Sequence, residues 1–394
     1  MPLAAREPLV RIHRNISKRN PDQPIAIAEE GGTVKVVVAM SGGVDSSVAA
    51  AILKEEGYQV IGVTMQIWPS DEQAGDADRF GGCCGISAVE DAKRVAYKLD
   101  IPHYVMNFRD VFAQKVIADF CQEYSLGRTP NPCIRCNQYI KFDALLERAK
   151  RLGADFVATG HYARIEKDEA RGRYLLKKGI DQRKDQSYVL YPITQEQLAH
   201  TLLPIGNFTK ERVREMAGES GLPVATKPES QEICFIPDND YPAFLQEYTP
   251  QAVKPGPILD KEGSVLGQHR GILFYTIGQR RGLGISAREP LYVIAIDQEE
   301  DAIVVGSKQE IYGDELIASD LNWITMAEPD QPITVRAKIR YLHQEAEAKI
   351  TPLDGNQVYV KFNEPQMAIT PGQAIVFYDG DTVVGGGTIE QIRK

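Results

Sequence analysis

The sequence predicts an α/β protein, with a doubly wound parallel sheet followed by two small β-rich domains, the last a β-barrel. Three observations support this fold class. A β-branched run at residues 34–38 leads into Ser41-Gly42-Gly43 and then into small, helix-compatible residues. Strand-like and helix-like stretches then alternate to about residue 245, which is typical of a parallel sheet covered by helices. From about residue 250, short alternating runs stand between Gly, Pro and Asp-Gly turns, as in antiparallel sheets.

The elements of the sheet domain follow in order from this start. The expected strands are 34–38, 59–66, 101–108 and 155–162, and the expected helices are 48–58, 91–99, 110–126 and 142–152. Ser87 and Glu90 form a capping box before the second of these helices. Ligands of such sheets bind where the strands end. Gly43 and Gly160 both stand at such ends.

The chain has 394 residues, too many for one compact core. We expect an extension at 1–33, the sheet domain at 34–245, a small central β-rich domain at 246–312 and the barrel at 313–394. The extension is basic and carries Glu7 as its single acid before residue 20. We interpret it as a loosely ordered segment, and not as a targeting peptide.

Composition narrows the function classes. No apolar run is long enough to span a membrane and the chain does not begin with an apolar signal region, so we expect a cytoplasmic protein without a membrane partner. The formal net charge of −9 argues against a surface that binds nucleic acid all over. A polyanion would have to be met by local basic patches. The six cysteines do not form the framework of a secreted protein; they indicate catalysis, metal binding or core packing.

The turn after the first strand predicts an anion site. Gly42 and Gly43 let the backbone approach a ligand closely, and the helix that follows presents N–H groups and the positive end of its dipole. The spacing is neither that of the common phosphate loop nor G-x-G-x-x-G. It resembles the SGGxDS loop of the ATP pyrophosphatases, which cleave ATP to AMP and pyrophosphate while adenylating a carbonyl oxygen. The alternative is a tight turn that binds nothing.

A series of further motifs accompanies this loop, and together they resemble the bacterial tRNA-specific 2-thiouridylase family. The series comprises Thr129-Pro130-Asn131-Pro132, Cys136-Asn137, Thr159-Gly160-His161-Tyr162, Lys184-Asp185-Gln186-Ser187-Tyr188, Glu229-Ser230-Gln231-Glu232-Ile233-Cys234-Phe235-Ile236 and Thr276-Ile277-Gly278-Gln279-Arg280-Arg281-Gly282-Leu283. The resemblance covers nearly everything after residue 34. It implies replacement of the 2-oxygen of the wobble uridine by sulfur.

The resemblance also implies roles for individual residues. The residues that would bind ATP, with Mg²⁺ as its companion ion, are Ala39, Met40, Ser41, Gly42, Gly43, Val44, Asp45, Ser46, Met65 and Gly160. Those that would border the target base or contact tRNA are Asn131, Pro132, Cys133, His161, Lys184, Asp185, Gln186, Arg340, Tyr341 and Gln373. Cys234 would accept a persulfide from a sulfur-relay protein or cysteine desulfurase, and Cys136 would free the sulfur. Asp45 is expected to be needed for adenylation.

The chemistry suits these residue types. Uridine O2 is a poor leaving group, and transfer of AMP to it makes it a good one. The attacking atom must be a soft nucleophile that is ionised near neutral pH, as a cysteine persulfide is. A thiolate is favoured beside cations, and Arg135 and Lys141 flank Cys136 in the sequence.

The chain departs from one common form of the family at Cys133, where Asp often stands. Cys133 and Cys136 thereby form a pair, and the resemblance places Cys234 nearby. Three thiolates are the ligand set of an iron–sulfur cluster with one open iron that could hold hydrosulfide. Two routes therefore compete: a persulfide on Cys234 followed by a Cys136–Cys234 disulfide, or a cluster held by Cys133, Cys136 and Cys234. We favour the persulfide.

Basic residues gather in the C-terminal half. His269, Arg270, Arg280 and Arg281 lie in the central domain, and Arg336, Lys338 and Arg340 alternate along a predicted strand at 335–341. Alternation places the last three on one face, with Tyr341 adjacent. RNA phosphates could pair with them, and Tyr341 could stack on a base. The alternative is a solvated strand face.

Two other functions fit part of the sequence. Another ATP pyrophosphatase that adenylates a small-molecule carbonyl would use the same loop, but would need neither the cysteine pair nor a basic barrel. A cluster-bearing tRNA sensor without enzymatic activity would leave the loop at 41–47 without a purpose. Pyrophosphate release that depends on added tRNA would distinguish the three.

Overall fold

The computed structural model describes residues 33–67, 86–229, 233–236 and 240–393, which form two compact units. Cys83, Cys84 and nearly all of the N-terminal extension lie outside the described residues. The first unit comprises the chain up to Phe108 with Phe142–Ser187 and Glu196–Cys234; the second comprises Arg109–Lys141, Tyr188–Gln195 and Phe235–Lys394. Each unit has a hydrophobic core of its own. No helix in the described ranges has the length and apolarity needed to cross a bilayer.

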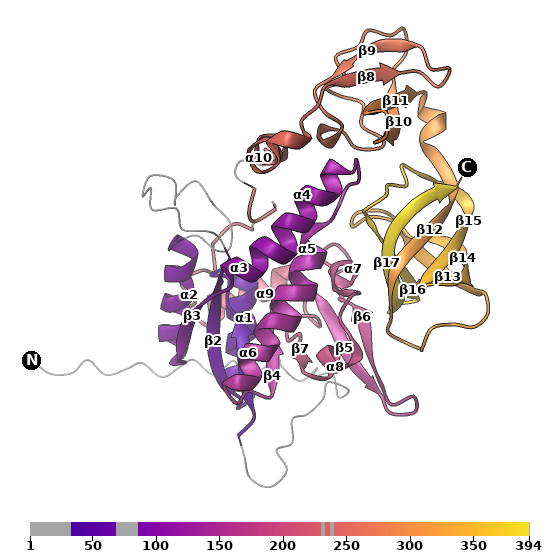
Figure 1. The fold of residues 1–394 in the computed structure, drawn as a ribbon. Helices are drawn as coiled ribbons and strands as arrows, with labels where there is room; N and C mark the ends of the chain where they lie inside the picture. Colours follow the sequence, from indigo (N-terminus) through magenta and orange to yellow (C-terminus); the bar gives the residue numbers. More distant parts are fainter. Residues whose placement is uncertain (1–32, 68–85, 230–232, 237–239, 394) are drawn as a thin grey trace, which may run out of the picture. The chain divides into compact units, whose positions relative to one another are not determined.

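The first unit is built on a parallel sheet with the strand order β3-β2-β1-β4-β7 (Figure 1). The strands are β1 (Lys35–Ala39), β2 (Gln59–Gln66), β3 (His103–Asn107), β4 (Phe156–Ala158) and β7 (Thr201–Leu202). The chain extends the sheet to one side of β1 with β2 and β3, and to the other side with β4 and β7. Such a reversal leaves a crevice at the carboxyl ends of β1 and β4. The predicted doubly wound sheet is confirmed.

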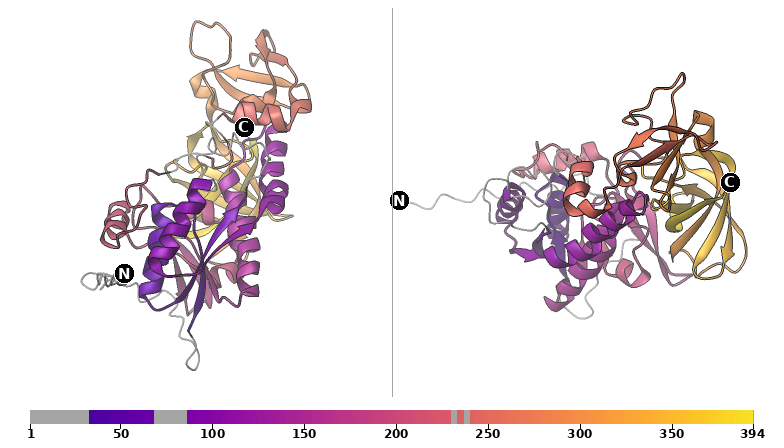
Figure 2. Two further views of the ribbon diagram at one scale, coloured as in Figure 1. Left: turned by 90° about the vertical axis from the view of Figure 1, so that its left-hand side faces the viewer. Right: turned by 45° about the horizontal axis from the view of Figure 1, so that its top comes forward.

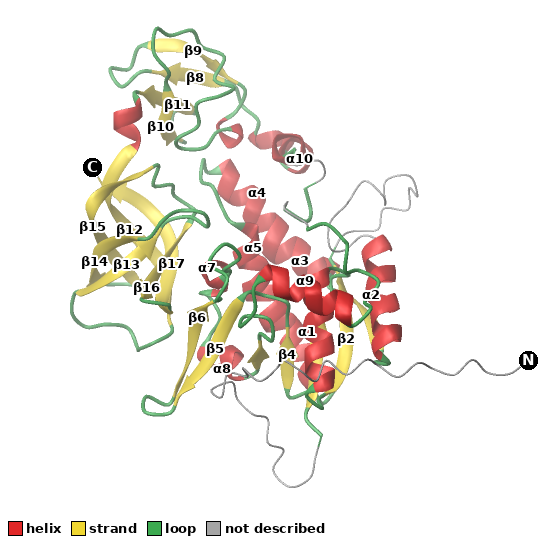
Figure 3. Cartoon of the chain, turned by 180° about the vertical axis from the view of Figure 1, so that it is seen from behind, coloured by secondary structure: helices red, strands yellow, loops and turns green. Residues whose placement is uncertain are grey.

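Helices α1, α2 and α9 form a common core with β1 (Figure 3). The helices of this unit are α1 (Val44–Glu55), α2 (Ile86–Leu99), α6 (Leu145–Arg151), α8 (Gln195–Ala199) and α9 (Lys210–Glu219). Val36 and Val38 project from one face of β1, as alternate strand residues do, and are fully buried in this core. The small residues Ala49 and Ala50 of α1 are also fully buried. The antiparallel hairpin of β5 (Ala163–Asp168) and β6 (Arg173–Lys178) follows β4.

The second unit begins with a long helix, which Figures 1 and 2 show as a continuous rod. It consists of α3 (Arg109–Phe112), the π-helical segment η1 (Ala113–Ile117) and α4 (Ala118–Ser125). A second helix starts with α5 (Pro132–Arg135) and continues as the π-helical segment η2 (Cys136–Ala144). Phe120 packs edge-on against Phe235 and against Phe244 of α10 (Tyr241–Tyr248). This aromatic cluster joins the first helix to the chain that leads into the β-rich part.

Two antiparallel-rich modules complete the second unit. The smaller has the strand order β10-β11-β8-β9, and the larger is a six-stranded antiparallel barrel that closes because β12 pairs with both β15 and β17. The smaller module contains β8 (Gly256–Leu259), β9 (Val265–His269), β10 (Tyr292–Asp297), β11 (Ala302–Gly306) and the 3₁₀ turns η4 (Pro250–Ala252), η5 (Ile272–Phe274) and η6 (Lys308–Ile311). The barrel contains β12 (Tyr312–Trp323), β13 (Ile333–Lys338), β14 (Ala346–Leu353), β15 (Gln357–Met367), β16 (Ala374–Asp379) and β17 (Thr382–Arg393). The predicted β-rich modules and terminal barrel are confirmed.

Some boundaries differ from the predicted ones for local reasons. The helix predicted at 142–152 already begins at Pro132, because Asn131 caps it and proline suits the first helical position. The strand predicted at 155–162 comprises only Phe156–Ala158. The basic strand predicted to reach Tyr341 ends at Lys338, so Arg340 and Tyr341 lie in the bend and turn that follow.

Candidate functional site

The loop between β1 and α1 has the geometry of an anion cradle. Gly42 has a φ of +68°, and a Cβ added there would lie 2.2 Å from the carbonyl oxygen of Ala88, so only glycine fits. Gly43 is the N-cap of α1 and has no side chain to accept from the N–H groups of the first turn. Those groups and the helix dipole therefore favour an anion at the loop.

Serine side chains hold the loop in shape. Ser46 Oγ accepts from the Ser41 N–H at 3.2 Å, and Ser47 Oγ donates to the Gly43 carbonyl at 2.7 Å. Met40 is buried, and its carbonyl accepts from Thr64 Oγ1 at 2.8 Å. The loop is thus preorganised by hydrogen bonds within the turn and with neighbouring β2.

The residues that the sequence assigned to ATP come together at the switch point of the sheet. A Cβ on Gly160 would lie 2.6 Å from both the Asp45 carbonyl carbon and the Ser46 nitrogen, so the turn after β4 touches the first turn of α1. Met65 lies near the end of β2, next to β1 in the sheet, and is half-buried. Ala39 and Val44 are buried on either side of the loop. Their direct contact with ATP stays a prediction.

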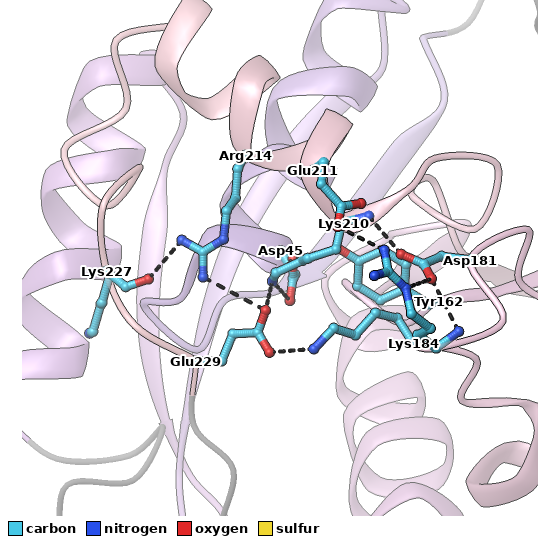
Figure 4. Close-up of polar contacts among 10 residues, drawn as sticks. Asp45, Tyr162, Asp181, Lys184, Lys210, Glu211, Arg214, Lys227 and Glu229 are labelled. Atoms are coloured by element: carbon cyan, nitrogen blue, oxygen red, sulfur yellow. Dashed lines mark hydrogen bonds and ion pairs between the residues drawn. The ribbon is translucent and has the colours of Figure 1, made fainter.

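Asp45 is the centre of a charged cluster that the sequence did not indicate (Figure 4). Lys210 Nζ donates to both Asp45 carboxylate oxygens, at 2.7 and 2.8 Å, and the Tyr162 hydroxyl donates to Oδ1 at 2.8 Å. The Lys210 side chain is only 7 % exposed. Burial, followed by the charge of Asp45, raises the pKa of Tyr162 well above its ordinary value, so it remains a donor.

A second carboxylate, Glu229, extends this cluster. It receives Lys184 Nζ at 2.6 Å, Lys210 Nζ at 3.3 Å and Arg214 Nη2 at 3.7 Å. The hydrogen bond from Lys184 lowers the pKa of Glu229, against the opposing effect of burial. Lys227 approaches the loop as well, with Nζ 3.0 Å from the Gly42 carbonyl oxygen. Glu229 and Lys184 belong to two separate sequence motifs, and only the fold brings them into contact.

Several predicted tRNA contacts also support the fold of the first unit. Asp185 is buried and accepts from the Gly179 N–H at 3.0 Å and from the Ser187 hydroxyl at 2.8 Å. Gln186 Oε1 accepts from the Tyr162 N–H at 2.9 Å. His161 is buried, with Nδ1 2.7 Å from Thr159 Oγ1. These contacts fix the loop that carries Lys184; contact with tRNA stays a prediction.

The cysteine pair stands at the start of a helix in the second unit. Asn131 Oδ1 accepts from the Cys133 N–H at 3.1 Å, and Pro132 occupies the first helical position. Cys133 is exposed, whereas Cys136 is half-buried where the π-helical segment begins. Such segments occur frequently at functional sites. Arg135 forms an ion pair with Asp119 at 3.3 Å and donates to Gln138 Oε1 at 3.1 Å.

The other cysteines have different surroundings. Cys234 is half-buried and its contacts group it with the first unit. Burial raises the pKa of the Cys121 thiol to about 11, so it is not a nucleophile at neutral pH. Across the described residues, no three His, Cys, Asp or Glu side chains are grouped as metal ligands.

Of the predicted tRNA residues in the barrel, Gln373 contacts the turn that precedes Cys133, and Arg340 bonds to the end of β15. Gln373 Nε2 donates to the Thr129 carbonyl at 2.8 Å, and the Thr129 N–H donates to the Pro371 carbonyl at 2.9 Å. Arg340 Nη1 donates to the Met367 carbonyl at 2.9 Å. These bonds hold the 129–132 turn and Arg340 against the barrel.

Lys338 stands over two aromatic rings close by. Its Nζ lies 5.8 Å from the Tyr188 ring centroid and 5.7 Å from the Tyr341 ring centroid. Tyr188 is fully buried, and Tyr341 is half-buried. In proteins that bind single-stranded RNA, an aromatic ring stacks on a base and a neighbouring cation pairs with a phosphate.

The fold and the loop define a nucleotide-binding α/β protein of the ATP-pyrophosphatase class with an appended barrel. Three domain families match in succession: the tRNA methyl transferase HUP domain at residues 34–238, the tRNA methyl transferase PRC-barrel domain at 242–307 and the aminomethyltransferase beta-barrel domain at 313–389.

Two relatives that share one name match this chain over nearly their whole length. The tRNA-specific 2-thiouridylase MnmA of Heliobacterium modesticaldum is 61% identical over 90% of this chain and 92% of its own length. That of Acetivibrio thermocellus is 57% identical over 90% of this chain and 99% of its own length. The chain belongs to the tRNA-specific 2-thiouridylase family. A solved 4-thiouridine synthetase–RNA complex with bound ATP is 19% identical, with a TM-score of 0.34 over 56% of this chain and 51% of that chain; a likeness this weak carries no argument.

Proposed function

We propose that this protein converts uridine to 2-thiouridine in tRNA, using ATP to activate the 2-oxygen. Relatives that are 57% and 61% identical are named tRNA-specific 2-thiouridylases, which supports the substrate and the product. The single observation that carries the activation step is the cradle at the switch point, where Gly160 closes on the first turn of α1. The proposed division is a catalytic domain at 34–245, a central domain at 246–312 and a tRNA-binding barrel at 313–394, and the proposed location is the cytoplasm.

The first step is adenylation. Uridine O2 attacks the α-phosphorus of ATP, an O–P bond forms, and pyrophosphate leaves. The N–H groups of the first turn of α1 would hold the departing phosphates by hydrogen bonds and by the helix dipole. Asp45 offers a carboxylate of the kind that Mg²⁺ prefers, and Mg²⁺ bound with ATP would offset phosphate charge.

The second step delivers sulfur. Cys234 would carry a persulfide supplied by a sulfur-relay protein or a cysteine desulfurase. The Cys136 thiolate attacks Cys234 Sγ and the persulfide S–S bond breaks, so the outer sulfur leaves as sulfide with both electrons. That sulfide adds to uridine C2, and AMP departs with the former O2. A Cys136–Cys234 disulfide remains, which an external thiol must reduce before the next turnover.

The residues proposed to bind tRNA come from both units. Asn131, Pro132 and Cys133 would border the base, and the other proposed contacts are His161, Lys184, Asp185, Gln186, Arg340, Tyr341 and Gln373. Lys184 and Arg340 supply positive charge for phosphates. Tyr341 supplies a ring for stacking.

Pyrophosphate release tests the proposal directly. With ATP, release should depend on unmodified tRNA. Asp45→Ala should abolish release without weakening tRNA binding, because Asp45 lies at the phosphate loop. Asp330→Ala, an exposed aspartate before β13, is the matched control and should behave as wild type. Equal loss of tRNA affinity in Asp45→Ala would contradict the assignment, and release without tRNA would indicate a small-molecule substrate.

A further inference from the structure

Four side chains of the first unit form a line of alternating charge. Lys184 Nζ lies 2.6 Å from a Glu229 oxygen, the other Glu229 oxygen lies 3.3 Å from Lys210 Nζ, and that nitrogen donates to Asp45 at 2.7 Å (Figure 4). Asp45 belongs to the phosphate loop, and Lys184 belongs to the segment proposed to contact tRNA. The line therefore joins the two substrate regions.

The two lysines of the line differ in exposure. The Lys210 side chain is 7 % exposed and that of Lys184 is 36 % exposed. Water screens charges weakly at the buried position, so a change in one ion pair is felt by the next. A polyanion in solution can reach Lys184, whereas Lys210 stays with the carboxylates of the protein.

Lys210 contacts both carboxylates of the line. Its ammonium group is now closest to Asp45 and has Glu229 at 3.3 Å as a second acceptor. Its backbone N–H is fixed by Asp181 Oδ2 at 3.0 Å, and the Asp181 carbonyl accepts from the Lys184 N–H at 3.0 Å. The backbones of both lysines are thereby held on one scaffold, and only their side chains need move.

We propose that Glu229 and Lys210 couple tRNA binding to ATP binding. When an RNA phosphate draws Lys184 away, Glu229 attracts Lys210 more strongly, and Lys210 leaves the Asp45 carboxylate available to the Mg²⁺ that accompanies the nucleotide. The reverse also holds, because binding free energies are linked reciprocally. Arg214, 3.7 Å from Glu229, keeps this carboxylate paired throughout. The inference rests on the proposed function, since it requires that both ligands bind.

The experiment measures the Kd for unmodified tRNA with and without a saturating non-hydrolysable ATP analogue, and the Kd for the analogue with and without tRNA, at one salt concentration. In the wild type each ligand should tighten the other by about fivefold or more, equally in both directions. In Glu229→Gln the Kd measured without the other ligand should exceed the Kd measured with it by less than about twofold, while each ligand alone still binds. Glu229→Asp, which keeps the charge but retracts it, should give an intermediate ratio.

Matched variants separate coupling from general damage. Glu166→Gln alters another carboxylate with two cations, Arg164 at 3.3 Å and Lys177 at 2.8 Å, and should retain the wild-type ratio. Melting curves identify any variant that fails to fold. If Glu229→Gln does not fold, the ratio of Kd values is measured in Glu229→Asp instead. Wild-type coupling retained in Glu229→Gln, or no coupling in the wild type although both ligands bind, would overturn the inference alone. A wild type that binds no tRNA would overturn the proposed function with it.

Discussion

At the scale of single residues, the glycines around the phosphate loop allow contacts that side chains would forbid. Gly42 faces the Ala88 carbonyl, and Gly160 faces the backbone of Asp45 and Ser46. Because neither position has a Cβ, these backbone segments can approach each other closely around the loop. Cys133 is the opposite case. It is exposed, and its bond to the Asn131 cap uses its backbone N–H, which a substitution of the side chain retains.

Replacement of Cys133 distinguishes the two sulfur routes. Cys133→Asp should retain single-turnover thiolation by a persulfide donor within about twofold, with no iron in the protein, because on this route Cys133 only borders the base. Cys136→Ser should abolish thiolation but retain pyrophosphate release. Wild-type activity found only after anaerobic iron reconstitution, and lost together with iron in Cys133→Ser, would instead establish the cluster.

At the scale of elements, local capping explains why several helices begin where they do. Asn131 caps α5, Thr209 Oγ1 caps α9 by accepting from the Arg212 N–H, and Ser307 with Glu310 forms a capping box at η6. The cap at Thr209 places Lys210 at the first position of α9, from which its side chain reaches Asp45. A local signal thus positions a residue whose partner lies far away in the chain.

The capping box of η6 makes a pH-dependent contribution to stability. Hydrogen bonds from Ser307, with Lys261 nearby, lower the pKa of Glu310 from 4.5 to about 2. A carboxyl group with a lowered folded-state pKa stabilises the fold above its unfolded pKa, and this stabilisation is lost as the pH falls towards 2. Glu310→Gln should therefore lower the Tm by about 2 °C at pH 6.

The difference in Tm between Glu310→Gln and the wild type should narrow steadily below about pH 4.5. The measurement is a series of thermal melts from pH 6 to pH 3. Glu262→Gln is the control, because the Glu262 side chain is exposed. It lies 4.0 Å from the same Lys261, farther than Glu310 at 3.1 Å. A Tm difference for Glu310→Gln that stays constant over this range would contradict the assignment.

At the scale of the whole molecule, the second unit unites the cysteine pair with the barrel. Residues 109–141 belong to the same compact unit as the barrel. The segments that directly precede and follow them in the sequence belong to the first unit. Arg128 pairs with Glu390 of β17 at 2.7 Å, and Gln373 holds the Thr129 carbonyl. The segment that would receive the base and the barrel that would bind tRNA are thus one body.

Substitution of Arg340 tests whether the second unit binds RNA. One guanidinium nitrogen binds the Met367 carbonyl, and a guanidinium has further N–H donors for a phosphate. Arg340→Ala should weaken tRNA binding about three- to tenfold and lower the slope of log K against log salt by about one. Lys349→Ala, which removes an exposed cation of β14 that is not among the predicted RNA contacts, and a melting curve are the controls. Unchanged affinity and slope would leave Arg340 a purely structural residue.

The sequence by itself determined the features that depend on neighbouring residues. The buried β1, the glycine turn and the start of α1 follow from a continuous run at 34–50, and the Asp-Gly turns and alternating runs indicate the barrel. Even there, the length of the basic strand was wrong, because Arg340 turns to bind the Met367 carbonyl where the alternating pattern continues.

Only the tertiary structure decided which distant side chains meet. Lys210 and Asp45 are 165 residues apart, and Arg128 and Glu390 are 262 residues apart. No local pattern specifies such a partner, because a charged residue can be satisfied by water wherever packing does not bury it. The parallel pairing of β1 with β4 and the packing of α9 on α1 bury Lys210 beside the phosphate loop. There, a lysine without a carboxylate would be too costly, so the fold fixes its partner.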